Sequence, residues 1–324
     1  MIRRSARVLA GLLVVLVAPV ISGQQAGVTR VELPADVTYP EGIAHDPKRN
    51  VIYTGSAASG TVVRIALDSG QVSSVSAGGS LMATEPFPAL LGMKVDASGR
   101  LWIAGGRTGQ IVVVDSQTGK PLKKLEVPTQ GASLINDVVI VGSNAYFTDS
   151  LTPTLWRVAT SADRIGDLEP WMQFGGTALE YTKPGANLNG IAASADGRYL
   201  VVVQMNKGLL FRIGVQDKQV AQIDLGGELV TTGDGLVLDG RTLHVVCQGE
   251  QQIVTIELSA DLAKGRVASR FKDPALAWPA TAAKVGDRLL VVNTQFNKRN
   301  TKDPVLPFSI ISVPVSMLAQ KAKP

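Results

Sequence analysis

Four side chains with oxygen donors stand at matching places in a sequence that repeats itself. Each begins an alternating apolar run that is typical of a β-strand. The six runs of this kind begin at Glu41, Leu91, Asn136, Asn189, Asp234 and Pro279. Oxygen donors with no Cys or His at the matching places favour hard cations such as Ca²⁺, Mg²⁺ or Mn²⁺. The first question is therefore whether the fold brings these six places together.

The spacing of the six places indicates the fold. They are separated by 50, 45, 53, 45 and 45 residues, which is the length of a four-stranded propeller blade. Within each unit, apolar runs are joined by turns rich in Asp, Gly, Ser and Asn, and no long stretch has the 3.6-residue period of a helix. We therefore predict an all-β, six-bladed β-propeller of four-stranded antiparallel blades over residues 28–315, with the six places around one mouth of its channel.

The two ends of this domain predict how the ring closes. The last unit lacks a fourth apolar run, and the alternating segment 28–33 has no blade of its own. Pairing this segment with the last blade as its outermost strand would remove an exposed sheet edge. Residues 316–324 are expected to be a tail.

The first residues predict export. Residues 1–23 combine three early arginines, the apolar run 8–21 and a small-residue end at Ser22 and Gly23, which is the layout of a signal peptide. The apolar run is shorter than the roughly 20 residues that span a bilayer, and it contains Pro19. We expect cleavage, no stable membrane anchor after it, and a periplasmic or secreted product.

Composition excludes several function classes. The formal charge of +5 falls to +2 without the three leader arginines, and the other basic residues are scattered, so no nucleic-acid partner is expected. Cys247, the single cysteine, excludes an internal disulfide and lies in an apolar run, which predicts a packed thiol. His244 is also expected to be packed. The sequence contains no Gly-x-Ser-x-Gly elbow, so a serine hydrolase is not expected. The protein is expected to be a monomer.

A cation would explain why carboxylates converge on the propeller axis. Two buried carboxylates that lie close together repel each other and resist desolvation unless a cation joins them. The predicted ligands of a divalent metal are Glu41, Asn136, Asn189 and Asp234. Ca²⁺ suits this mixture of amides and carboxylates best, and Mg²⁺, Mn²⁺ and Zn²⁺ are the other candidates. In the alternative interpretation, Asn136 and Asn189 cap the strand starts and Glu41 is exposed.

The segments around these four residues resemble a known family. They are Pro40-Glu41-Gly42, Ile135-Asn136-Asp137, Leu188-Asn189-Gly190 and Gly233-Asp234-Gly235. Over residues 38–313 the chain is similar to the six-bladed propellers of the regucalcin, gluconolactonase and luciferin-regenerating-enzyme family. The resemblance implies that the matching Glu, Asn, Asn and Asp bind a metal, and that Asp234 is a candidate base or nucleophile. Members that act on sugar lactones have Arg where this chain has Leu134, which indicates a more hydrophobic substrate, or none.

Further residues are expected near the mouth, because the loop after each second strand returns to that face. The predicted pocket residues are Leu134, Asp149, Gln204, Asn206, Gln248 and Asn293. The stretches 76–90 and 174–187 reach the same face and could act as lids, with Phe87 and Tyr181 supplying apolar contacts.

Two functions fit these features. The first is an exported metal-dependent hydrolase of lactones, esters or phosphotriesters, in which the metal polarises the substrate oxygen and Asp234, assisted by Asp137, takes part in catalysis. The alternative is an exported propeller without catalysis, in which a structural metal ties the blades together and the loops bind a small ligand or a protein.

Overall fold

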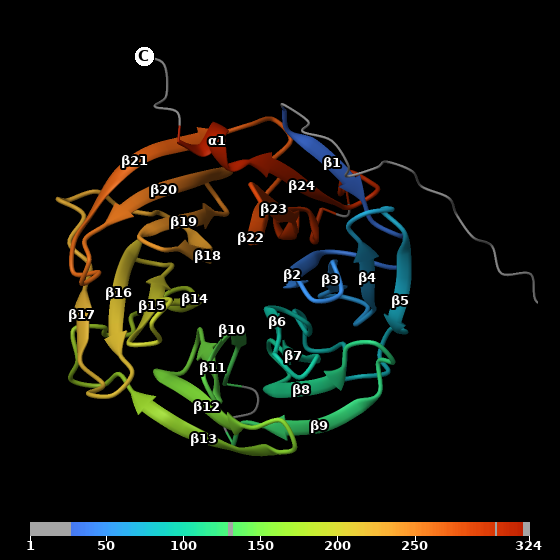
Figure 1. Ribbon diagram of the computed structural model, residues 1–324, viewed down its shortest axis with the longest axis horizontal. Coiled ribbons are helices and arrows are strands. Elements are labelled where there is room, and N and C mark those ends of the chain that lie inside the picture. The colour runs from blue at the N-terminus through green and yellow to red at the C-terminus, as the bar shows by residue number, and fades with distance from the viewer. Residues whose placement is uncertain (1–26, 129–131, 302, 320–324) are drawn as a thin grey trace, which may run out of the picture.

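The computed structural model describes residues 27–128, 132–301 and 303–319. Six four-stranded antiparallel sheets are arranged as a ring around a common axis (Figure 1). The predicted all-β, six-bladed propeller is confirmed. Residues 1–23, the predicted leader, lie outside the described residues. Within the described part of the chain, no helix is both long and apolar enough to cross a bilayer.

Each blade is named here by its strands, from the axis outwards. Blade one has β2 (Pro40–Asp46), β3 (Val51–Ser56), β4 (Val62–Ala66) and β5 (Val72–Ser76), and blade two has β6 (Met93–Val95), β7 (Arg100–Ala104), β8 (Gln110–Asp115) and β9 (Pro121–Glu126). Blade three has β10 (Ile135–Val141), β11 (Asn144–Asp149), β12 (Thr154–Thr160) and β13 (Ile165–Gln173), and blade four has β14 (Leu188–Ala193), β15 (Tyr199–Gln204), β16 (Leu209–Gly214) and β17 (Val220–Gln222). Blade five has β18 (Gly233–Asp239), β19 (Thr242–Cys247), β20 (Gln252–Leu258) and β21 (Gly265–Lys272), and blade six has β22 (Pro279–Val285), β23 (Arg288–Asn293), β24 (Ser309–Pro314) and β1 (Thr29–Glu32). A 3₁₀ turn, η1 (Phe296–Lys298), and a short helix, α1 (Val315–Leu318), complete the described elements.

The core lies between neighbouring blades. Strands in the middle of a blade are covered on both faces, so their sequences are continuous apolar runs rather than alternating ones. Residues 200–203 of β15 and 289–292 of β23 are examples, and their side chains are 2% exposed or less. Apolar side chains of adjacent blades pack into shared clusters, as those of blades four and five do. Burial between blades therefore holds each sheet at a fixed tilt, and the inner strands all begin on one face, called the mouth face here.

The ring closes through the first and last segments of the domain. β1 pairs antiparallel with β24, with Arg30 opposite Ile311 and Val31 opposite Ile310. The side chains of Val31 and Leu33 are buried in the core between blades six and one. The predicted closure is confirmed, and it couples the two ends of the domain.

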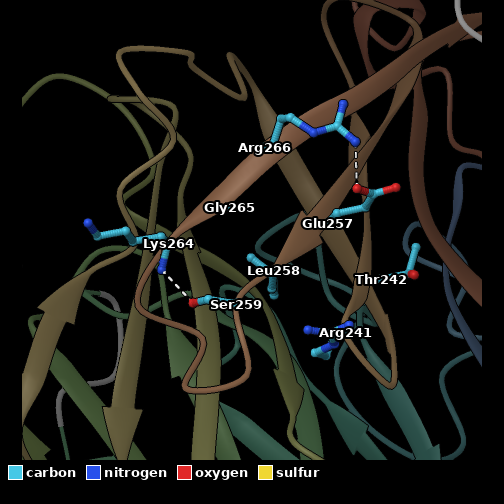
Figure 2. A pocket seen from close by; sticks show the side chains of 8 residues that line it. All are labelled: Arg241, Thr242, Glu257, Leu258, Ser259, Lys264, Gly265 and Arg266. Carbon is cyan, nitrogen blue, oxygen red and sulfur yellow. Dashed lines mark hydrogen bonds and ion pairs between the residues drawn. The ribbon is translucent and has the colours of Figure 1, made fainter.

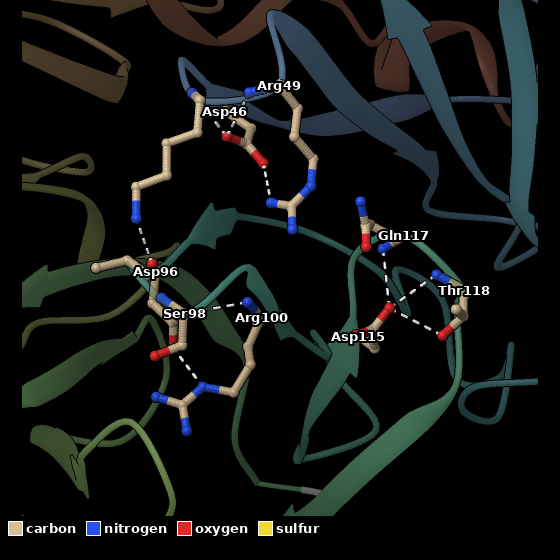
Figure 3. Close-up of polar contacts among 10 residues, drawn as sticks. Asp46, Arg49, Asp96, Ser98, Arg100, Asp115, Gln117 and Thr118 are labelled. Carbon is tan, nitrogen blue, oxygen red and sulfur yellow. Dashed lines mark hydrogen bonds and ion pairs between the residues drawn. The ribbon is translucent and has the colours of Figure 1, made fainter.

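Carboxylates organise the turns on the face opposite the mouth (Figure 3). Asp46 and Arg49 form an ion pair of 2.7 Å at the end of β2, and Asp96 and Arg100 form one of 2.6 Å after β6. Asp115 accepts hydrogen bonds from backbone N–H groups of the β8–β9 turn. These three carboxylates are used for turn structure and lie at the far ends of their strands from the mouth face.

Removing residues 28–33 should destabilise the whole ring. A chain that begins at Pro34 loses the β1 ladder and the burial of two apolar side chains, each worth about 1.5–3 kcal/mol. Compared with a chain that begins at Gly27, its melting temperature should fall by about 5–15 °C. Equal melting temperatures for the two chains, measured by circular dichroism, would show that β1 does not close the ring.

His244 should make the fold sensitive to acid. The side chain is 2% exposed, and burial, its largest influence, lowers the pKa to about 4. A histidine whose pKa is lower in the folded state contributes stability at neutral pH that is lost as the pH falls from about 6.5 towards 4.

Chemical unfolding at pH 7 and pH 4.5 tests whether His244 causes this loss of stability in acid. We expect this residue alone to account for about 2–3 kcal/mol of the loss in unfolding free energy. A His244→Gln variant, which can still hydrogen bond to Thr255, should lose that much less than the wild type. The same pH dependence in both proteins would contradict the assignment.

Candidate metal centre at the mouth of the ring

Irregular pairing at the start of the inner strands produces the centre. The register shifts just after the first paired residue in β2, β10, β14, β18 and β22, which marks a β-bulge in each. A bulge leaves residues outside the ladder and re-aims their side chains. The first bulge residue is Glu41, Asn136, Asn189 or Asp234 in four of these strands. We call these four residues the ligand ring.

The register corrects one predicted equivalence. Pro279 pairs with Asn293 directly before the bulge, as Pro40 pairs with Ser56 in the first blade. Ala280, and not Pro279, therefore takes the place that corresponds to Glu41. The sequence comparison was wrong by one residue because blade six has no polar side chain to mark the place. Ala280 has no oxygen in its side chain, so the ring is still open on that side.

The second bulge position explains why the ring residues are followed by glycine. A Cβ added to Gly42 would lie 2.1 Å from the backbone oxygen of Leu91, and one added to Gly190 would lie 2.2 Å from that of Asp234. At these two positions neighbouring inner strands thus approach so closely that no side chain fits between them. In β10 the position holds Asp137, whose carboxylate accepts hydrogen bonds from the backbone N–H groups of Val138 (2.8 Å) and Ile191 (3.1 Å).

Three ligand-ring oxygens are buried with no hydrogen-bond partner. They are Oε2 of Glu41 and Oδ1 of Asn136 and of Asn189. Nine such side-chain atoms occur among the described residues, and these three stand at one equivalent place on three blades. A buried acceptor without a donor costs about 1–3 kcal/mol. Three of them at equivalent places form one set of acceptors, which a cation or a water molecule could satisfy.

The two amides are held with their oxygens free. The Nδ2 group of Asn136 donates to Ser150 Oγ at 3.0 Å, and that of Asn189 donates to Met205 Sδ at 3.3 Å. Ser150 in turn donates to the backbone oxygen of Leu188 and so connects blades three and four. These contacts orient each amide, and they leave the Oδ1 atoms as the available acceptors. Ser150 and Met205 were missed in the sequence, where neither stands out as a partner of an amide.

The two carboxylates of the ligand ring share one electrostatic environment. Burial raises the pKa of Glu41 well above its ordinary value, and the charges of Asp234 and then Asp137 raise it further. Burial, followed by the charge of Asp137, likewise raises the pKa of Asp234, while a hydrogen bond from Asn189 lowers it. Because the charge of Asp234 acts on Glu41, the two carboxylates lie near each other. A cation between them would remove the repulsion.

Lys94 adds a positive charge close to this centre. It lies in β6 and is half-buried, and its charge lowers the pKa of Glu41 and that of Asp137. Burial is nonetheless the largest influence on Asp137, whose pKa is raised overall. No sequence pattern singles out Lys94, because it begins no run and belongs to no motif.

The predicted pocket residues have different roles. Gln248 alone contacts the ligand ring, through a hydrogen bond of 2.7 Å from Nε2 to Oδ2 of Asp234. Three others anchor loops. The side chain of Asp149 bonds to Leu134 and Thr152, and that of Gln204 bonds to Glu180 and Asn187. The side chain of Asn293 bonds to Ala275 and Ala277. Asn206 is exposed and donates to the backbone oxygen of Thr182. Leu134 packs against Leu91 in an apolar cluster.

The ligand ring fits a hard divalent cation. It offers two carboxylates and two amide oxygens, all buried, in the oxygen-rich pattern that Ca²⁺ prefers. Among the described residues no group of three or more His, Cys, Asp and Glu side chains could hold a metal ion. The ligand ring is not a cluster of that kind, because two of its four donors are amides. Its fit to a cation rests on the unpartnered buried oxygens instead.

A surface hollow elsewhere on the molecule has no part in this centre. It measures about 610 Å³ and is lined by residues 241–242, 257–259 and 264–266 of blade five (Figure 2). These residues lie at the turns on the face opposite the mouth. Arg266 and Glu257, which line it, form an ion pair of 2.5 Å and are largely exposed. The hollow is an open surface depression on the other face of the ring from the ligand ring.

Comparisons with known proteins agree with the fold and the resemblance. Residues 20–136 match the SMP-30/Gluconolactonase/LRE-like region. The fold is similar to that of regucalcin, a calcium-binding protein from Agrobacterium tumefaciens, with a TM-score of 0.64 and 17% identity over 88% of this chain and 92% of the other.

Two further structures share the fold. They are a gluconolactonase from Xanthomonas campestris (TM-score 0.59, 16% identity, 89% of both chains) and virginiamycin B lyase from Staphylococcus aureus (TM-score 0.57, 13% identity, 89% of this chain and 98% of the other). No curated protein sequence matches the chain. The resemblance noted from the four ring segments is thus confirmed, while these identities carry the fold alone.

Calcium should stabilise the protein through Asn189. With Ca²⁺ at about 100 times its dissociation constant, the wild type should gain about 2.7 kcal/mol and melt about 5 °C higher. An Asn189→Leu variant should keep or raise its melting temperature in chelator, because it removes an unpartnered buried oxygen, but it should gain nothing from Ca²⁺.

Asn206→Leu is the matched control, because its amide is exposed and bonds to residues 182–187 of the preceding loop rather than to the ligand ring. It should respond to Ca²⁺ like the wild type. An equal calcium response in Asn189→Leu would contradict the assignment of this residue to the ligand ring.

Proposed function

We propose that this chain, whose residues 20–136 match the SMP-30/Gluconolactonase/LRE-like region, is an exported hydrolase of lactones or related esters or phosphotriesters that depends on a divalent cation, Ca²⁺ above the other candidates. The observation that carries the proposal is the set of three unpartnered buried oxygens beside Asp234. The similarity of the fold to a gluconolactonase and to a calcium-binding regucalcin supports it.

Hydrolysis of a lactone needs an attacking water, a proton acceptor and stabilisation of negative charge. The water oxygen adds to the carbonyl carbon, the ring C–O bond breaks, and the water's proton ends on the released oxygen, which gives a hydroxy acid. When bound, the cation supplies a positive charge that polarises the substrate oxygen.

Asp234 is the proposed proton acceptor. Its pKa is raised by burial and by the charge of Asp137, and a carboxylate with a raised pKa is a stronger base towards water. The hydrogen bond from Gln248 engages one carboxylate oxygen and holds the group in one orientation. Because Asp137 has both oxygens bonded to backbone N–H groups, its proposed part is to position the strand and to tune Asp234.

Leu91 and Ala280 leave the ligand ring open on two sides. Their side chains are 2% and 0% exposed, and neither carries a donor, so these are the two positions of the ring at which a coordination place is left for a substrate oxygen or a water. The fold also hosts a lyase, and fold alone does not decide the reaction. Export is proposed from the composition of residues 1–23. We further propose that the protein is a monomer that acts on a small molecule, with no nucleic-acid partner and no stable membrane anchor after processing.

A substrate panel with and without chelator tests the function. Aryl esters, lactones and phosphotriesters should include at least one compound whose turnover requires the cation. Asp234→Asn should lower kcat on it by about 10²-fold or more, because it removes the proton acceptor.

The matched control is Asp239→Asn at the other end of β18, where the carboxylate is exposed and pairs with Lys284 at 3.0 Å. It should change kcat less than twofold. Turnover that survives both chelation and Asp234→Asn would refute the hydrolase. Calcium binding without turnover of any compound would favour a non-catalytic binding propeller.

A further inference from the structure

An apolar cluster lies directly beside the ligand ring. We call it the mouth cluster. Three of its side chains are buried and three are partly buried, and they are Ala57, Leu91 and Leu134, with Phe87, Leu151 and Phe296 packed against them. Its members come from blades one, two, three and six, and all stand at the mouth face.

The mouth cluster is continuous with the proposed catalytic centre. Leu91 takes the place in blade two that Glu41 takes in blade one, and Leu134 is two residues before Asn136. One side of the mouth is therefore polar and the other apolar. A ligand that reaches the ring from the side of Leu91, which is itself 2% exposed, would meet the partly buried side chains of Phe87, Leu151 and Phe296.

Leu134 is held in place by its backbone. Its N–H group donates to Asp149 Oδ1 at 3.0 Å, and its carbonyl oxygen accepts from the N–H group of Ser150 at 2.8 Å. The buried Asp149 therefore holds the backbone at the start of β10, where both Leu134 and Asn136 lie. The apolar surface is thus formed before any ligand arrives.

Two loops form a single aromatic wall on this cluster. Phe87, from the loop between β5 and β6, and Phe296, in η1, pack edge to face with ring centroids 5.1 Å apart. The guanidinium of Arg299 lies 3.8 Å from the ring centroid of Phe87 and 3.7 Å from Glu85. The contacts tie the two loops together.

The other predicted lid loop differs. Tyr181 stacks on Phe174 with centroids 6.0 Å apart and donates its hydroxyl to the backbone oxygen of Asp149. Its ring therefore packs against the core of blades three and four. Of the two predicted aromatic contacts, only Phe87 faces the mouth cluster.

We propose that the mouth cluster binds an apolar substituent of the substrate. The inference rests on the proposed function and narrows it: the hydrolase acts on lactones or esters with an alkyl or aryl chain. A polyhydroxylated sugar lactone would lose hydrogen bonds to water against Leu91, Leu134 and the two phenyl rings, and it would gain none there. An alkyl chain would instead be removed from water together with the partly exposed rings.

A chain-length series tests the inference. The substrates are γ-lactones with alkyl substituents from methyl to hexyl, with glucono-δ-lactone as the polar reference. In the wild type with Ca²⁺, kcat/KM should rise by about two- to fourfold for each added CH₂ until the cluster is filled, mostly through KM. Phe87→Ala and Leu134→Arg should flatten this dependence, and Leu134→Arg should also raise the relative rate on glucono-δ-lactone.

The control is Leu122→Ala, an exposed apolar side chain of β9 at the rim of blade two. In this variant kcat/KM should depend on chain length as it does in the wild type. If Leu134→Arg does not fold, Phe87→Ala on its surface loop carries the test alone. Turnover that requires the cation but does not depend on chain length, or an unchanged series in Phe87→Ala, would overturn the inference and leave the proposed hydrolase standing.

A binding measurement distinguishes a failure of this inference from a failure of the proposed hydrolase. γ-Lactams with the same alkyl chains can be titrated into the calcium-loaded protein by calorimetry, whether or not any lactone is turned over. Affinity should rise with chain length in the wild type and in Leu122→Ala, and this rise should be lost in Phe87→Ala. Absence of binding by every lactam, or affinity that does not change with chain length, would refute the apolar subsite.

Discussion

Buried negative charge at the mouth of the ring is the constraint that organises this protein. Glu41 and Asp234 are each about 95% buried or more, and burial raises the pKa of both. The charge of Asp234 raises the pKa of Glu41 further. Isolated carboxylates are hydrated far better in water than in a protein interior. Their convergence is stable when a cation, or a proton, balances them. The unpartnered amide oxygens of Asn136 and Asn189 are two further acceptors at this place, which a cation could satisfy together with the carboxylates.

The rest of the fold serves to hold these groups in place. Bulges at the strand starts take the ring residues out of the ladders, and glycine at the next position lets the strands approach within contact distance. Packing between blades fixes the tilt of each strand, and β1 closes the ring so that no blade can move outwards. A local site thus depends on contacts that span the whole sequence, from Val31 to Ile310.

The sequence predicted the architecture well because the signals repeat. Six units of similar length, each with its own turns and apolar runs, give six independent indications of the same blade. The segment 28–33, which belongs to no unit, could then be assigned to the incomplete last blade. The equivalence of the four ring positions was predictable for the same reason, because they recur from blade to blade, whereas Asn136 alone would have meant nothing.

The direction of single side chains was not predictable. Asp149, Gln204 and Asn293 end their strands at the mouth face, yet they bond to loops, because buried polar groups take the nearest backbone partners. The one-residue error at Pro279 arose because nothing polar marks Ala280. Lys94, Ser150 and Met205 reach the centre through packing between blades, and no sequence pattern records such contacts.

Calorimetric titration of Ca²⁺ into chelator-treated protein tests the central claim most directly. We expect one bound ion per chain, and no measurable binding by the double variant Glu41→Gln and Asp234→Asn, provided that this variant still folds as judged by its circular dichroism. Failure of the wild type to bind Ca²⁺ or any other divalent cation, or binding that is unchanged in the folded double variant, would contradict it.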